Sequence, residues 1–214
     1  MLSISFFTLL TLFGLALWTN LRRAQQKINF ELTNNLLMTK HPLLFVNPRR
    51  SLFYWSHPWN QIPTYLSAHG YETFERSLPP SSQTSERTKA LLLSLKELSQ
   101  QSFKFHLFFE QSQSDVLREL LLLELPSSVA SLNYLGPQDF EWKGLKSPPL
   151  PVHHIALPAE APPLFYSFHL WLTGQKRNPP PPLGLRSQPQ DYHALLQHIQ
   201  IQAEKDFLES SSNL

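Results

Sequence analysis

The strongest constraint on the fold is an alternation of short apolar runs with longer amphipathic segments between residues 42 and 136. An apolar run of four to eight residues that is bounded by turn-forming residues suits a strand buried on both faces. The runs that we interpret as strands are Leu43–Asn47, Tyr71–Pro79, Lys104–Phe109 and Ser127–Gly136. Because helical patterns separate them, the sequence predicts an α/β fold: a parallel sheet flanked by helices.

The helices expected between these strands cover residues 57–70, 81–101 and 115–124, with Gly70 as the C-cap of the first. From residue 138 to residue 163 the pattern breaks into prolines, and we expect irregular structure there. A last strand is predicted at Leu164–Gly174, and a proline-rich loop follows it. The closing helix is predicted at residues 191–210, because apolar residues recur there on one face.

The N-terminal segment Leu2–Trp18 carries no charged side chain, and Arg22, Arg23 and Lys27 follow it. About 20 apolar residues span a bilayer, so this run is close to the required length. A cleaved signal peptide would need a positive start and a small-residue cleavage site, which are missing here. The sequence therefore predicts an uncleaved single-pass membrane anchor, with an inefficient signal peptide or a buried core helix as the alternatives.

These features divide the chain into four parts. Residues 1–20 form the expected transmembrane anchor, residues 21–41 a polar stalk, residues 42–209 one folded domain, and residues 210–214 a disordered tail. A domain of this length supports one sizeable core. Positive charge on the C-terminal flank of the anchor favours a cytoplasmic domain.

Composition excludes several classes of function. The formal net charge is only +2 with both signs mixed, so no nucleic-acid-binding surface is expected. The chain has no cysteine, which excludes disulfides, thiolate metal sites and cysteine catalysis. His153 and His154 would point to opposite faces of a strand and lack a third ligand, so we expect neither a metal nor a cofactor. The expected partners are the lipid bilayer and a lipid-like ligand or a protein.

Four segments of the sequence each resemble a part of one known enzyme family. They are residues 42–79, 105–124, 129–144 and 191–210. The first resembles the first strand, oxyanion loop and next strand of the α/β-hydrolase family, in particular its small lipase-like branch. The second is similar to that family's nucleophile strand, elbow and following helix. The third resembles a strand and loop that commonly read Gly-x-Pro-His-x-Gly, and the fourth the final helix. The resemblance implies an α/β-hydrolase-like sheet and a serine esterase ancestry.

The resemblance places Ser112 at the nucleophile position and His193 at the position of the catalytic base. The elbow of these enzymes reads Gly-x-Ser-x-Gly, and here Glu110 and Ser114 occupy the two glycine places. A β-carbon and a carboxylate in that junction would strain the turn and oppose the oxyanion that forms in acyl transfer. The expected elbow is therefore damaged.

The expected oxyanion loop is altered as well. The His-Gly of the family is replaced by Asn47 followed by a proline, which has no N–H to donate. Donors would have to come from Arg49, Arg50 or Gln113, and we predict these residues with Asn47 as the ligand-binding remnant of the oxyanion region. No Asp or Glu lies between residues 161 and 190, so the triad acid is not identifiable.

Three functions remain open from the sequence. The first is a catalytically impaired pseudo-lipase that binds a ligand or a protein at the membrane. The second is an active serine carboxylic-ester hydrolase that uses Ser112 and His193. The third is a structural subunit of a membrane complex. We interpret the damage to the elbow, oxyanion loop and acid as favouring a protein that is not an efficient enzyme.

Overall fold

The computed structural model describes ten stretches of the chain. They are residues 7–15, 18, 37–47, 59, 62–79, 83–100, 104–123, 125–136, 150–157 and 189–212. The first of these is helical. Within the described residues, no helix has the length and hydropathy that crossing a bilayer requires.

The core of the structure is a five-stranded sheet in which every neighbouring pair of strands is parallel. The strands follow one another across the sheet in the order β2-β1-β3-β4-β5. Their bounds are β1 Leu43–Asn47, β2 Thr73–Ser77, β3 Phe105–Glu110, β4 Val129–Gly136 and β5 Val152–Ala156. The predicted α/β fold class is thus confirmed as a parallel sheet flanked by helices.

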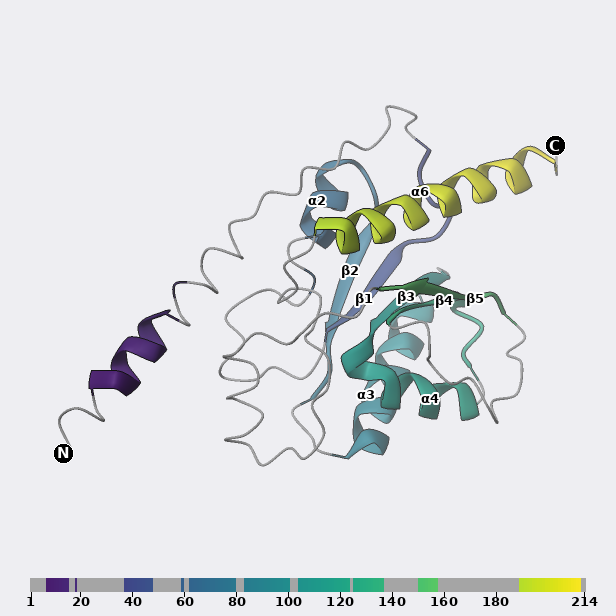
Figure 1. The fold of residues 1–214 in the computed structure, drawn as a ribbon. Helices are drawn as coiled ribbons and strands as arrows, with labels where there is room; N and C mark the ends of the chain where they lie inside the picture. Colours follow the sequence, from purple (N-terminus) through teal and green to yellow (C-terminus); the bar gives the residue numbers. More distant parts are fainter. Residues whose placement is uncertain are drawn as a thin grey trace.

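The helices lie on both faces of this sheet (Figure 1). The structure has α2 (Ile62–Ala68) and α6 (Pro189–Ser211) on one face, and α3 (Thr84–Ser99) and α4 (Ser114–Leu122) on the other. The chain crosses the sheet in one direction from β1 through α2 to β2, and in the opposite direction from β2 through α3, β3 and α4 to β4. Because both kinds of crossover are right-handed, α2 lies on one face and α3 and α4 lie on the other. The direction reverses between β1 and β3, which makes their carboxyl ends the topological switch point.

Two apolar layers hold the helices in place because side chains alternate between the faces of each strand. Phe45 of β1 and Phe108 of β3 stack with their ring centroids 5.0 Å apart on the α2/α6 face. Leu44 and Leu107 point to the α3/α4 face. All five residues of β1 are buried, as expected for a central strand of a parallel sheet.

Two sequence predictions need correction. Residues 138–163 were expected to be irregular, yet β5 lies within them and pairs with β4 over its whole length. Its two histidines and flanking prolines conceal the strand pattern, and the exposed edge of β4 supplies the pairing. The closing helix α6 begins at Pro189 and continues to Ser211, beyond the predicted start of the tail at residue 210. The strand predicted at Leu164–Gly174 lies outside the described residues.

The end of α2 confirms the role expected for Gly70. Its φ angle is +93°, a left-handed conformation in which glycine carries no Cβ penalty. The N–H of Gly70 donates to the Ser67 carbonyl at 3.0 Å, and the N–H of Tyr71 donates to the Leu66 carbonyl at 3.1 Å. This pair of bonds is the Schellman motif, and it turns the chain directly into β2.

We expect Gly70→Ala to lower the free energy of unfolding by about 1–2 kcal/mol, because alanine must adopt a left-handed backbone conformation. The added Cβ would also lie 2.7 Å from Cε of Met38, which must move aside. Urea denaturation monitored by circular dichroism measures the change. Ser67→Ala, on the exposed side of the same helix, is the matched control and should change stability by no more than about 0.5 kcal/mol.

Candidate functional site

The residues predicted from the serine motif lie at the carboxyl edge of the sheet, beside the switch point. Asn47 is the last residue of β1, and Glu110 is the last residue of the neighbouring strand β3. Both lie two residues beyond the stacked pair Phe45 and Phe108, so their side chains share the α2/α6 face. Ligands of open α/β sheets bind at this kind of crevice, which makes this edge the candidate site.

Ser112 lies in a single turn of 3₁₀-helix, Gln111–Gln113, between β3 and α4. Glu110 is the N-cap of this turn, and its carboxylate accepts the backbone N–H of Gln113. The side-chain oxygen of Gln113 accepts the backbone N–H of Glu110 in return, at 2.9 Å. This reciprocal capping box satisfies two donors that the end of a strand would leave open. The Glu-Gln-Ser-Gln sequence thus encodes a regular turn.

Gln113 also ties this turn to the neighbouring strand. Its side-chain N–H donates to the carbonyl of Val46, which also accepts the indole N–H of Trp59 at 3.3 Å. Gln113 and Trp59 are fully buried. The backbone N–H of Gln113, which the sequence offered as an oxyanion donor, is already used by the Glu110 carboxylate.

The hydroxyl of Ser112 donates to Oε1 of Glu110 at 2.8 Å. Glu110 is only 2 % exposed, so this carboxylate is a fixed buried acceptor next to the serine. The turn ends at Gln113 with φ −112° and ψ 15°, and Ser114 after it has the right-handed helical angles φ −57° and ψ −31°. Within this described turn, the strained elbow that the family resemblance implies is absent, because glutamate and serine in the glycine places have produced a capped turn instead.

Asn47 presents an acceptor at the site. Its side-chain N–H donates to Oε2 of Glu75 at 2.9 Å, and an ionised carboxylate can only accept, so the amide orientation is fixed. The amide oxygen of Asn47 is buried and has no hydrogen-bond partner. A free carbonyl oxygen opposes an anion, so the Asn47 side chain does not replace the lost oxyanion donors. Arg49 and Arg50 lie outside the described residues.

His193 is exposed and lies in the second turn of α6, since the helix begins before it. Later residues of α6 contact the middle and the start of the strands: His198 reaches Asn133 of β4, and Asp206 reaches His106 of β3. The helix therefore runs opposite to the strands, and its first turns lie towards the carboxyl edge. The structure thus places His193 on α6, while the hydroxyl of Ser112 is bonded to Glu110.

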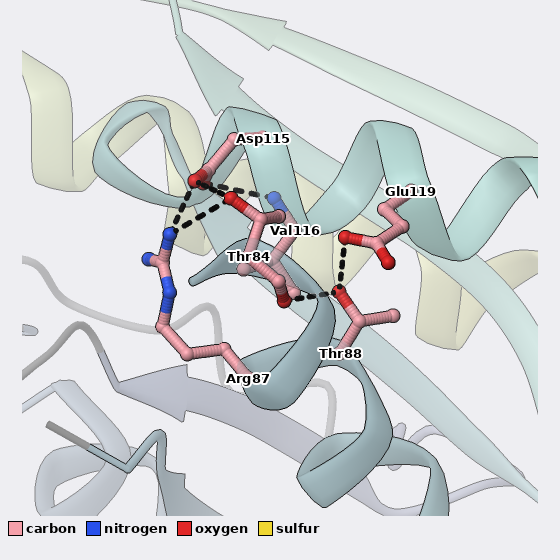
Figure 2. Close-up of polar contacts among 6 residues, drawn as sticks. All are labelled: Thr84, Arg87, Thr88, Asp115, Val116 and Glu119. Carbon is pink, nitrogen blue, oxygen red and sulfur yellow. Dashed lines mark hydrogen bonds and ion pairs between the residues drawn. The ribbon is translucent and has the colours of Figure 1, made fainter. Parts of the chain in front are cut away.

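A polar cluster fixes α4 against α3 directly after the serine turn, as Figure 2 shows. The carboxylate of Asp115, in the first turn of α4, pairs with Arg87 and accepts the hydroxyl of Thr84 at 2.8 Å. One turn further along each helix, Thr88 donates to Glu119 at 3.3 Å. Asp115, which follows the altered elbow in the sequence, therefore has a structural role.

Sequence reasoning missed a second polar constellation, which lies beneath α6 at the opposite end of the strands. Nδ1 of His106 is 2.8 Å from Oγ of Ser131, and Nε2 is 3.4 Å from a carboxylate oxygen of Asp206. These residue types are those of a serine triad. All three are at most 6 % exposed and sit between the sheet and the helix, so no substrate reaches them. Their signal in the sequence is polar residues within otherwise apolar strands.

The two adjacent histidines of β5 diverge, as the strand period predicts. His153 packs against His198 on the α6 side, whereas His154 packs against Tyr134 on the opposite face. In the described part of the chain, no three histidine, aspartate or glutamate side chains are arranged to hold a metal ion.

Neither a scan against protein-family models nor a search among curated proteins gives a match for this chain. The carboxyl-edge site therefore has to be interpreted from its own geometry.

We expect Gln113→Leu to lower the free energy of unfolding by about 2–3 kcal/mol, because it leaves the buried Glu110 N–H without an acceptor and removes the link to β1. Gln111→Leu, in the same turn but only half-buried, is the matched control and should cost less than about 0.5 kcal/mol. Equilibrium denaturation of both variants measures the difference. Equal losses would show that the capping box does not hold this edge together.

Proposed function

We propose that this chain is a membrane-anchored protein whose α/β-hydrolase-like domain binds a lipid-like ligand or a protein partner instead of hydrolysing an ester efficiently. The main observation behind the proposal is the hydrogen bond that the Ser112 hydroxyl donates to the buried carboxylate of Glu110. The same carboxylate takes the backbone N–H that would otherwise stabilise an oxyanion.

The chemistry of acyl transfer explains why this arrangement disfavours catalysis. Attack by the serine oxygen creates a negative charge on the substrate, which needs nearby N–H donors. Here the Glu110 carboxylate lies beside Ser112. The Gln113 backbone N–H and a side-chain N–H of Asn47 already have acceptors. Loss of one oxyanion donor alone raises the barrier by about 2.7–4 kcal/mol.

The strand order supports an α/β-hydrolase-like scaffold. It makes β1, which would precede the oxyanion loop, the direct neighbour of β3, which would carry the nucleophile. It also directs the first turns of α6, with His193, towards the same edge as Ser112. One scaffold can host different functions, so we propose that this edge binds a ligand although the chemistry is lost.

The membrane anchor rests on the uncharged segment Leu2–Trp18 and on the basic residues that follow it. Within it, residues 7–15 form a helix whose large apolar side chains are mostly more than half exposed. The exposed apolar side chains of this helix support the proposal that it is buried in a bilayer. The domain would lie on the cytoplasmic side of that bilayer.

A fluorophosphonate probe tests the catalytic state of Ser112. We expect the wild-type chain to react at least about 100-fold more slowly than an active serine hydrolase treated in parallel, the effect of a lost oxyanion donor. Ser112→Ala should leave the labelling unchanged, and Ser114→Ala, at the neighbouring serine, is the matched control. Rapid labelling that disappears only in Ser112→Ala would overturn the binding proposal.

The second candidate is an active serine esterase, and the Ser112–Glu110 bond is the observation that favours it. A carboxylate within hydrogen-bond reach of a hydroxyl can act as its general base. In that case Glu110→Gln would abolish probe labelling. If His193 were the base, His193→Gln would abolish labelling while Glu110→Gln would not.

Cell fractionation tests the anchor separately. We expect the full-length chain to sediment with membranes and to resist extraction at alkaline pH, because only a buried apolar helix survives that treatment. Deletion of residues 2–20 should move more than about nine-tenths of the protein into the soluble fraction. Deletion of residues 210–214 is the control and should leave the protein in the membrane. A full-length chain found mainly in the soluble fraction would contradict the anchor.

A further inference from the structure

Polar side chains form a row across the sheet beneath α6, in a layer that is otherwise apolar. The register places His106 of β3 beside Ser131 of β4, and Asn133 of β4 beside His153 of β5. From the helix above them, His198 contacts Asn133 and His153. The row thus joins three strands to α6, and its histidines are side chains that can gain or lose protons.

The hydrogen bonds fix the proton on His198. The side-chain N–H₂ of Asn133 donates to the Leu107 carbonyl at 3.2 Å and to Oγ of Ser131 at 3.0 Å. Its oxygen therefore faces Nε2 of His198 at 2.8 Å, and Nε2 must be the donor. A second proton would have to go to Nδ1 of His198. The centroid of this ring lies 5.1 Å from the centroid of the His153 ring.

One carboxylate holds the other end of the helix. Asp206 accepts the backbone N–H of Lys40 and the side-chain N–H of Gln202, each at 2.8 Å, and faces Nε2 of His106 at 3.4 Å. The ring of His41, just before β1, packs 5.5 Å from His106.

The charges around the row are unbalanced. The positive or protonatable groups that act on it come from every element packed there: His41 and Lys40 before β1, Lys104 and His106 at β3, His153 on β5, and His198 and Lys205 on α6. Among the described residues, the carboxylate that acts on His41 and His106 is that of Asp206. Each further proton on a histidine therefore adds repulsion beneath the helix.

We propose that this row is an acid-sensitive latch, in which protonation of the buried histidines releases α6 from the sheet. The proposal goes beyond ligand binding and does not depend on it. The released helix would uncover the apolar residues that it now buries, which include Leu195, Leu196 and Ile199. They pack in the same layer as Trp59, next to the carboxyl-edge site.

The direction of the pKa shifts agrees with this geometry. Burial, and then the neighbouring His153, lowers the pKa of His198 to about 4. Burial is also the main cause that lowers the pKa of His153 and of His41. Since these values lie below that of the unfolded chain, about 6.5, the latch is fully stabilising above pH 6.5 and weakens as pH falls towards 4.

Asp206 acts outside this window. Burial alone would raise its pKa, but hydrogen bonds from His106, Gln202 and the Lys40 backbone together bring the pKa below its usual value. Its contribution is therefore present above its normal pKa, about 3.9, and is lost only in stronger acid. Between pH 6.5 and pH 4 the latch is weakened through His41, His153 and His198, whose pKa values are lowered.

Hydrogen exchange of the full-length chain in detergent micelles, read by mass spectrometry, tests the latch. After correction for the intrinsic exchange rate, we expect the opening of α6 to increase about 30-fold between pH 7.5 and pH 5.0. This factor follows for His198 alone from a pKa of about 4 in the closed state and about 6.5 in the open one. Peptides of α3, on the opposite face, should change less than about threefold.

His198→Gln is the decisive variant, because glutamine can still donate an N–H towards Asn133 but cannot take a proton. We expect it to lose most of the 30-fold increase, while His69→Gln, at an exposed histidine just after α2, keeps it. If His198→Gln does not fold at pH 7.5, His153→Gln removes a titrating group from the same row and should also reduce the increase. An unchanged increase in the folded variants, a pH-independent α6, or equal loss of protection in α3 and α6 would overturn the latch.

Discussion

The burial of both faces of the parallel sheet is the constraint on which the rest of the structure depends. A parallel strand at the centre of a sheet cannot face water, so all five residues of β1 are buried, the first four of them apolar, and the strand needs helices on both sides. The right-handed crossover rule then assigns α2 to one face and α3 and α4 to the other. The same rule places the reversal of direction between β1 and β3, and with it the candidate site.

At that site, the requirements for a stable Gln111–Gln113 turn conflict with those for a serine nucleophile. The end of β3 must satisfy its backbone donors before α4 begins, and Glu110 and Gln113 do so by capping each other. A serine nucleophile in the same place would need those donors free and the carboxylate absent. The capping box makes the turn stable and regular, and it does so with the groups that acyl transfer would use. This is the physical reason for preferring binding to hydrolysis at this edge.

The polar row beneath α6 shows a different use of buried hydrogen bonds. A continuous apolar layer would hold the helix as well, or more strongly, because burying histidines and a carboxylate costs desolvation free energy. The bonds between His198 and Asn133 and around Asp206 instead restrict α6 to one register on the sheet. They also make its attachment depend on protons, which an apolar layer could not do. Register and pH response thus come from the same side chains.

The sequence by itself determined the elements whose signals are local. The apolar runs of β1 and β3, the C-cap at Gly70 and the amphipathic closing helix were all predicted, because each depends on residues within one or two turns of the chain. It could not reveal β5, whose pattern is hidden by His153 and His154 and whose pairing comes from the edge of β4. Ser112 and Gln113 were identified as candidates and Glu110 as a change that damages the elbow, but their mutual bonds depend on a 3₁₀ turn that no motif specified. Only the tertiary structure brought Asp206 to His106 and His198 to Asn133, since residues 65 or more positions apart in the chain meet only when the helix packs on the sheet.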